Sequence, residues 1–288
     1  MADISAALVM KLRKMSGQGM MDCKAALAET GGELDEAMTL LRKKGMATME
    51  KRAGRETSEG KVVCSAQEDS KLAAMATLCC ETDFVAKSDD FNAVTEILGK
   101  CILNCDADSG AGNLAETEID GRKLSEIITE TVSKTGEKTE LGDYARFKID
   151  GAGLIGTYVH FNGKIGAMVE IETSDDSVAA DSAMKQLATD ISMHIAAIKP
   201  IALDESAIDA DVIEKEKAIA ADQVKNKPAN IMDKIVEGKM KKFFAENCLV
   251  AQGFVKEEKK TVAEVLAQAA KDAGGTATIK QFVRFEIG

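Results

Sequence analysis

The sequence is poor in aromatic side chains and in proline. Tryptophan is absent from the 288 residues, two tyrosines and nine phenylalanines make up 4% of the chain, and only two residues are proline. Leucine, isoleucine, valine, methionine and alanine must therefore fill any hydrophobic core. Because large rings are scarce, a phenylalanine in an expected surface loop needs a specific explanation.

Further absences exclude whole classes of protein. No apolar run approaches the ~18 residues of a membrane span, and charge follows the short N-terminal apolar stretch, so we expect no signal peptide. The net charge of −11 disfavours nucleic-acid binding, since phosphate neutralisation supplies most of that affinity. Seven cysteines, an odd number without secreted-type spacing, indicate reduced thiols and a cytoplasmic protein.

Clusters typical of catalysis are also missing. The sequence has two histidines, and His160 lies beside no cysteine pair at zinc spacing. Gly151–Gly156 fits G-x-G-x-x-G, but strand-like segments flank it on both sides, whereas dinucleotide binding needs a following helix. We interpret it as a β-turn and expect no catalytic residue, no metal and no cofactor. Nucleophilic catalysis remains possible only if the fold brings a cysteine and a histidine together.

Residues 1–45 predict three short helices, separated at Gly17–Gly19 and Gly31–Gly32. Arg42–Gly45 is a helix-stop signal, with cations in the last turn and glycine just beyond, and 46–59 is expected to be a polar, partly helical linker. The expected apolar stripes are Leu8, Leu12 and Met15, then Cys23, Ala26 and Leu27, then Leu34, Ala37, Met38 and Leu41.

An internal repeat organises the remainder. Lys71–Met75 resembles Lys164–Met168, 93 residues later, and Lys123–Ile128 with Tyr144–Ile149 matches Thr261–Leu266 with Phe282–Ile287, 138 residues later. Each copy predicts a hairpin, two helices and a strand. The expected fold is α+β, with two subdomains, 60–150 and 151–288, whose antiparallel sheets carry helices on one face. The first offset also aligns two helical stripes: Phe91, Val94, Leu98, Ile102 and Cys105 with Met184, Leu187, Ile191, Ile195 and Ile198.

The offsets differ because the second copy carries an insertion at about 204–246. It predicts a helical hairpin, roughly Asp211–Asn226 and Pro228–Glu246, with proline suited to a first helical turn. Asn162–Gly163 predicts a tight hairpin turn in the same copy.

Three features leave a structural and a functional interpretation open. Phe84 follows a buried strand and is expected on a loop, where it either folds back as a hydrophobic staple or faces a partner. At the first offset Ser177 replaces it, so the scaffold tolerates serine there. Met20 and Met21 are adjacent and cannot both face the bundle core easily. His194 borders an apolar stripe, and spacing alone favours a core-margin residue.

Five segments resemble bacterial elongation factor Ts, the guanine nucleotide exchange factor of the GTPase elongation factor Tu. They are "LRKMSGQGMMDCKAAL" (12–27), "ETDFVAKS" (81–88), "MHIAAIKP" (193–200), "KMKKFFAE" (239–246) and "FVRFEIG" (282–288). The resemblance runs through nearly the whole chain. It implies a ubiquitin-associated-like bundle at 1–45 and a coiled-coil or dimerisation role for the helical hairpin, which contacts the GTPase or a second copy. Some members carry a further C-terminal helix, and the contact it makes is expected to be absent or replaced here.

The resemblance also implies residue roles. The loop Thr82–Val85 is expected to enter beside the partner's magnesium site and dislocate Mg²⁺, and the bundle and core supply further contacts. The implied residues are Thr82, Asp83, Phe84 and Val85 in the loop, with Arg13, Met20, Met21, Lys24 and His194 elsewhere. We hypothesise an exchange factor that makes and breaks no bond. The alternatives are a scaffold or adaptor protein and, less favoured, a small-molecule enzyme using Gly151–Gly156.

Overall fold

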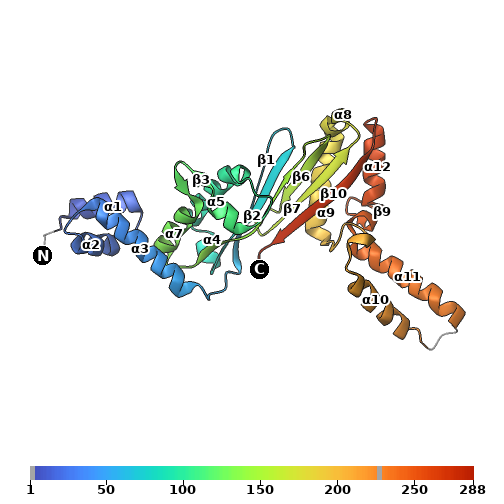
Figure 1. The fold of residues 1–288 in the computed structure, drawn as a ribbon, viewed down its shortest axis with the longest axis horizontal. Coiled ribbons are helices and arrows are strands. Elements are labelled where there is room, and N and C mark those ends of the chain that lie inside the picture. Colours follow the sequence, from blue (N-terminus) through green and yellow to red (C-terminus); the bar gives the residue numbers. More distant parts are fainter. Residues whose placement is uncertain (1–3, 226–228) are drawn as a thin grey trace. The chain divides into compact units, whose positions relative to one another are not determined.

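The computed structural model describes residues 4–225 and 229–288, as helices and small β-sheets, which confirms the predicted α+β class (Figure 1). The chain forms two compact units. The first comprises residues 1–65, 74–146 and 285–288, and the second comprises 66–73 and 147–284. Each unit contains one three-stranded sheet.

The first unit begins with the predicted three-helix bundle. Its helices are α1 (Ala6–Ser16), α2 (Met20–Glu29) and α3 (Leu34–Arg52). The predicted glycine breaks are confirmed, because Gly17 ends α1 in the left-handed conformation at φ 68° and its N–H donates to the carbonyl oxygen of Arg13. The bundle core consists of Val9, Leu12, Cys23, Ala26, Leu27, Ala37 and Leu41.

The stripe predicted for the first helix is partly wrong. Val9, Leu12 and Ser16 face the bundle core, whereas Met15 is 50% exposed. The buried residues recur at intervals of three and four, so the buried face is centred on Leu12 and leaves Met15 outside it.

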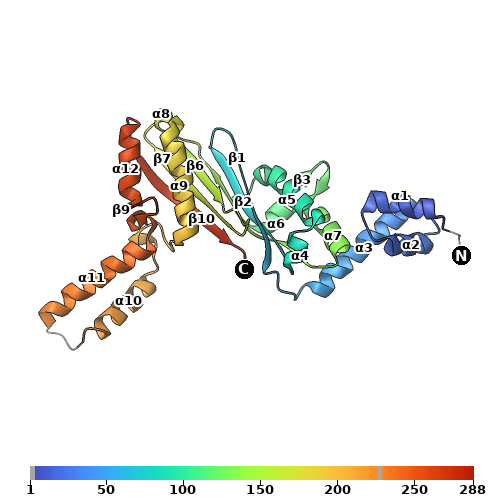
Figure 2. The ribbon, with the colours of Figure 1, turned by 180° about the vertical axis from the view of Figure 1, so that it is seen from behind.

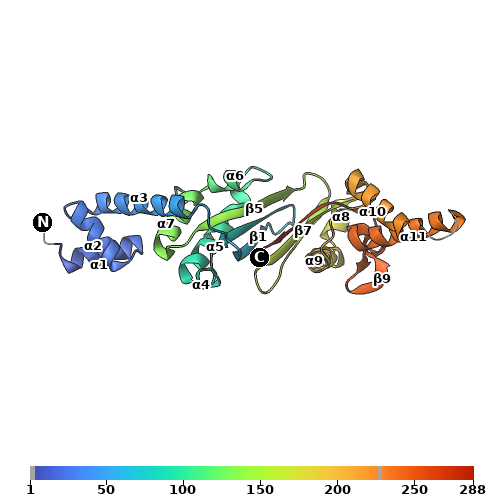
Figure 3. The same cartoon turned by 90° about the horizontal axis from the view of Figure 1, so that it is seen from below.

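The helix end predicted at Gly45 is also wrong, since α3 continues to Arg52 as one straight helix (Figure 3). The reason is a tertiary contact with α7 (Leu124–Thr135). A β-carbon at position 45 would lie 3.0 Å from the Ser133 β-carbon and 3.1 Å from the Thr129 carbonyl oxygen. Glycine here lets two helices approach closely and does not stop α3.

The first sheet has the order β1 (Glu59–Ala66), β2 (Leu72–Cys80), β5 (Thr139–Lys148). Helix α5 (Asp89–Cys101) and α7 supply its covering layer, because Phe91, Leu98 and Ile128 join Ala76 and Leu78 of β2 in one core. The smaller elements are α4 (Asp83–Ala86), η1 (Ile102–Asn104), α6 (Ala111–Ala115) and the two-stranded β3 (Glu118–Ile119) and β4 (Arg122–Lys123).

The second unit repeats this order. Strand β7 (Ile165–Thr173) lies between β6 (Gly153–Val159) and β10 (Ala277–Glu286), and β6 and β7 are antiparallel. Helices α8 (Asp176–Ala180), α9 (Ser182–Ile198) and α12 (Val262–Asp272) follow the hairpin, and α9 and α12 lie in front of the sheet in Figure 2. The predicted repeat is therefore structural. One stripe member is wrong, because Ile198 at the end of α9 is 44% exposed.

The segment Gly151–Gly156 runs into strand β6, which begins at Gly153, and no helix follows this segment. Gly156 lies directly under α9, where a β-carbon would meet the Ala188 carbonyl oxygen at 2.2 Å. This glycine thus serves close helix–sheet packing, which removes the dinucleotide-binding interpretation.

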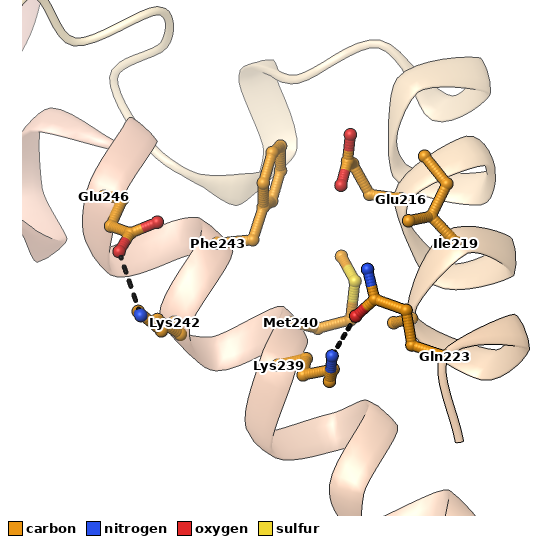
Figure 4. Close-up of a pocket in the computed structure, with 9 residues that line it drawn as sticks. Glu216, Ile219, Gln223, Lys239, Met240, Lys242, Phe243 and Glu246 are labelled. Carbon is orange, nitrogen blue, oxygen red and sulfur yellow. Dashed lines mark hydrogen bonds and ion pairs between the residues drawn. The ribbon is translucent and has the colours of Figure 1, made fainter.

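The insertion forms the predicted helical hairpin, α10 (Ala210–Asp222) and α11 (Ala229–Asn247). The predicted break at Asn226–Pro228 lies outside the described residues. Ile219, Met240 and Phe243 line a cleft between the two helices, and Lys239 donates to Gln223 across it (Figure 4). Short elements flank the hairpin: η2 (Glu205–Ala207), η3 (Leu249–Ala251), β8 (Gly253–Phe254) and β9 (Glu257–Thr261).

Candidate functional site

The segment after β2 forms a one-turn helix, α4, with an exposed phenylalanine. The Phe84 side chain is 82% exposed, while its neighbours Val85 and Ala86 are 8% and 6% exposed and belong to the core of the first unit. The two buried residues anchor the turn, and Phe84 projects from it. The hydrophobic-staple interpretation is therefore wrong, because the ring does not pack on the following helix.

Thr82 caps this turn and ties it to Glu137, which lies two residues after the end of α7. Its hydroxyl accepts from the Val85 N–H at 3.4 Å and donates to the Glu137 carboxylate at 2.9 Å. The Thr82 N–H also donates to Glu137, at 3.2 Å. A capping side chain with its own partner fixes the direction in which the turn starts.

Asp83 carries the charge beside the ring. Lys87 Nζ lies 2.7 Å from Asp83 Oδ2, one helical turn away, and both side chains are exposed. This hydrogen bond lowers the pKa of Asp83 below its ordinary value. The tip therefore presents a phenyl ring next to a carboxylate that stays ionised at neutral pH.

The second unit contains the same turn without the ring. In α8 the Asp175 carboxylate caps the N–H groups of Ser177 and Val178, and Val178 and Ala179 are buried like Val85 and Ala86. Ser177 is exposed at the position of Phe84. The turn forms with either residue, so folding does not require the phenyl ring at position 84.

The bundle residues singled out by the sequence are all on its surface. Met20 and Met21 open α2 and are 47% and 75% exposed, so neither faces the core. Arg13 on α1 and Lys24 on α2 are also exposed. Flexible thioether side chains beside cations make an adaptable contact surface.

His194 belongs to the core of the second unit, with no exposed surface. The Val255 N–H donates to its Nδ1 at 3.2 Å, so Nδ1 is unprotonated, and Nε2 donates to Gln252 Oε1 at 2.9 Å. Burial lowers the pKa of His194, only partly opposed by the Gln252 hydrogen bond. The neutral ring thus joins α9 to the segment that precedes β9.

Sequence reasoning missed a second exposed ring, Phe161, which is 93% exposed in the turn between β6 and β7. Strand β6 ends at Val159, two residues before this ring. The His160 ring lies 4.3 Å from it and accepts or donates a 2.8 Å hydrogen bond with the Tyr158 hydroxyl. The adjoining Asn162–Gly163 turn was the available signal that position 161 leaves the strand.

Burial makes two of the cysteine thiols poor nucleophiles. All seven cysteines lie in the described part of the chain, and Cys80 and Cys101 are buried. Burial raises the pKa of Cys80 to about 12 and that of Cys101 to about 11, so both stay protonated at neutral pH. Among the described residues, no helix is long and apolar enough to span a bilayer.

An α+β scaffold that projects an aromatic ring from a turn anchored in the core has the features of a binding protein. The family model described as elongation factor TS matches residues 81–288. The chain is 43% identical to elongation factor Ts of Nitratiruptor sp., over 99% of this chain and 93% of that protein. It is 39% identical to that of Desulfovibrio desulfuricans, over 100% and 99%, and 42% identical to that of Nautilia profundicola, over 100% and 94%. The chain belongs to the elongation factor Ts family, and so to the translation elongation factors of protein biosynthesis.

Proposed function

We propose that this protein is a guanine nucleotide exchange factor that binds elongation factor Tu·GDP and promotes GDP release, after which GTP rebinds. The observation that carries the proposal is the exposed Phe84 on a turn whose neighbours are locked into the core. No bond is made or broken. The exchange factor binds the nucleotide-free GTPase more tightly than the nucleotide-bound form, and reciprocity requires GDP affinity to fall by the same factor.

In this mechanism Thr82–Val85 enters the GTPase beside its magnesium site. Insertion of the Phe84 ring into a pocket contributes about 1.5–3 kcal/mol, which corresponds to roughly 10- to 100-fold in affinity. The tip displaces Mg²⁺ and thereby removes the main counter-charge of the diphosphate. A larger fall in GDP affinity requires the interaction energy of a wider interface.

Exposed residues of both units supply that interface. Arg13, Met20, Met21 and Lys24 on the bundle are accessible, and we add Phe161 as a second aromatic contact. His194 is buried, so we assign it an indirect role, in which it holds the Gln252–Val255 segment in place. We locate the activity in the cytoplasm, where free thiols are stable.

Release of fluorescent GDP from purified elongation factor Tu tests the proposal. Wild-type protein is expected to accelerate release, and Phe84→Ser to lower the rate at saturating protein by about 10- to 100-fold. Urea unfolding of Phe84→Ser should stay within about 0.5 kcal/mol of wild type, because α8 forms the same turn with Ser177.

The repeat supplies a matched control. The double variant Phe84→Ser/Ser177→Phe keeps the amino-acid composition and moves the ring to the other turn, so it should stay as slow as Phe84→Ser. Undiminished release by Phe84→Ser would refute the role of the ring. Binding to elongation factor Tu without any acceleration by wild type would support the scaffold alternative instead.

A further inference from the structure

Glu81, the residue before the capping Thr82, is held by three hydrogen bonds. Arg52 Nη1 donates to both carboxylate oxygens, at 2.8 and 2.9 Å, and the Lys138 N–H donates to Oε1 at 2.6 Å. The Glu81 side chain is only 14% exposed. Burial raises the pKa of Glu81, but the Lys138 and Arg52 hydrogen bonds outweigh it and hold the pKa below its ordinary value.

Arg52 is the last residue of α3. The N-terminal half of this helix contributes Ala37 and Leu41 to the bundle core. Its C-terminal half lies on α7, where Gly45 contacts Ser133 and Met49 accepts a hydrogen bond from Thr129 at 3.2 Å. One uninterrupted helix of about 28 Å therefore extends from the bundle to the residue that holds Glu81.

The end of α7 holds the same turn from a second direction. Gly136 ends α7 in the left-handed conformation, and the next residue, Glu137, receives both hydrogen bonds of Thr82. Lys138 then donates its N–H to Glu81. The two residues that precede Asp83 are thus fixed by the adjoining ends of two helices that pack on each other.

The loop between α1 and α2 also contacts α7, in the last turn of that helix. Lys134 lies against Gly17, where a β-carbon would be 2.6 Å from Lys134 Cε. Gly17 belongs to the loop that leads into Met20 and Met21 of α2. The partner-facing residues of the bundle and the tip at Phe84 are consequently connected by packed, hydrogen-bonded elements within one unit.

We propose that Arg52 and Glu137 are positioning residues for the exchange reaction, which lock the Thr82–Val85 turn to α3 and α7 so that docking of the bundle aims Phe84. The inference rests on the proposed function. It assigns these residues a role in orienting the ring, which the exchange rate at saturation reports separately from folding stability. A small displacement of the Thr82–Val85 turn should lower the exchange rate strongly, because the Phe84 ring must enter its pocket in a defined orientation.

The test is the GDP-release assay with Arg52→Gln over a range of exchange-factor concentrations. The rate at saturation should fall about tenfold, whereas the half-saturating concentration should change less than about threefold, because the bundle contacts are intact. Arg52→Lys should restore most of the rate, since both hydrogen bonds of Arg52 come from one nitrogen. Glu137→Ala, a second independent variant, removes the acceptor of both Thr82 hydrogen bonds and should also lower the rate at saturation. Lys51→Gln, on the exposed neighbour, removes the same charge and should behave as wild type.

A background variant separates orientation from general loosening. In Phe84→Ser protein the ring is absent, so adding Arg52→Gln should cause no further loss of rate. Two outcomes would overturn the inference while leaving the proposed function intact. One is a further tenfold loss of rate when Arg52→Gln is added to Phe84→Ser protein. The other is a wild-type rate at saturation for both Arg52→Gln and Glu137→Ala in protein that retains Phe84. Failure of wild-type protein to accelerate release would overturn the proposed function itself.

Discussion

At the scale of single residues, neighbours in the chain have opposite environments. Phe84 is 82% exposed and Val85 is 8% exposed, because a one-turn helix points successive side chains about 100° apart. The buried residue stabilises the turn, and the exposed one is free for recognition. Buried His194 is the opposite case, with both ring nitrogens hydrogen-bonded inside the protein.

His194 should make folding stability depend on pH. Its folded pKa is lowered, so the unfolded chain binds a proton that the folded protein rejects. Stability is therefore full above the unfolded pKa of about 6.5 and decreases as the pH falls below it, by at most about 1.4 kcal/mol at pH 5.5. Urea unfolding at pH 7.5 and 5.5 measures the loss.

The control for this prediction is NMR of the histidine ring protons, which resolves two residues easily. His194 should remain neutral at pH values where a free histidine is already protonated. Titration of His194 at an ordinary pKa would contradict the prediction.

At the scale of elements, the long helix α3 shows how a distant contact overrides a local signal. Arg42–Gly45 has the composition of a helix end, yet α3 passes through it because Gly45 lies against Thr129 and Ser133 of α7. A pattern within four residues contains no information about a helix that begins nearly eighty positions later.

Gly45→Leu should therefore destabilise the first unit by about 1–3 kcal/mol, since the larger side chain must push α7 away. Urea unfolding followed by circular dichroism measures the change. Gly238→Leu on α11 is the matched control, because a β-carbon there meets no atom within 4 Å. Leucine at 238 should stabilise its helix by several tenths of a kcal/mol, and equal destabilisation by both variants would show that α7 is not the cause.

At the scale of the whole molecule, the sequence predicted much of the architecture but little of the site's support. The two offsets identified both sheets, because each repeat keeps its apolar pattern. The exposure of Phe84 could not be predicted from the sequence, because a phenylalanine in a loop can pack inward or project into solvent with the same local sequence. The Arg52–Glu81 and Thr82–Glu137 hydrogen bonds join residues 29 and 55 positions apart, and no periodicity reports such pairs.

The helical hairpin should be dispensable for folding of the second unit. The sheet core of that unit contains no described residue from 209–247. Ile208 and Cys248, which flank this segment, belong to one buried cluster, so the ends of the deletion are close. Replacing 209–247 with two glycines should keep cooperative unfolding and cost about 1–3 kcal/mol from lost contacts of Phe243 and Phe244.

The same deletion tests the prediction that the hairpin pairs two copies. Sedimentation equilibrium of the full chain and the deletion variant compares their masses. A dimer that becomes a monomer would confirm pairing through the hairpin, and a full chain that is already monomeric would contradict it.

The paired turns α4 and α8 also predict how positions 84, 85 and 86 diverge among species. Val85 and Ala86 touch neighbours in their own protein, so substitutions there should be compensated within the same gene. The side chain at 84 extends into solvent. Under the proposed function, the residue type at this position is therefore constrained by the binding partner. Covariation at position 84 should therefore be found between genes, with residues lining the nucleotide pocket of the GTPase.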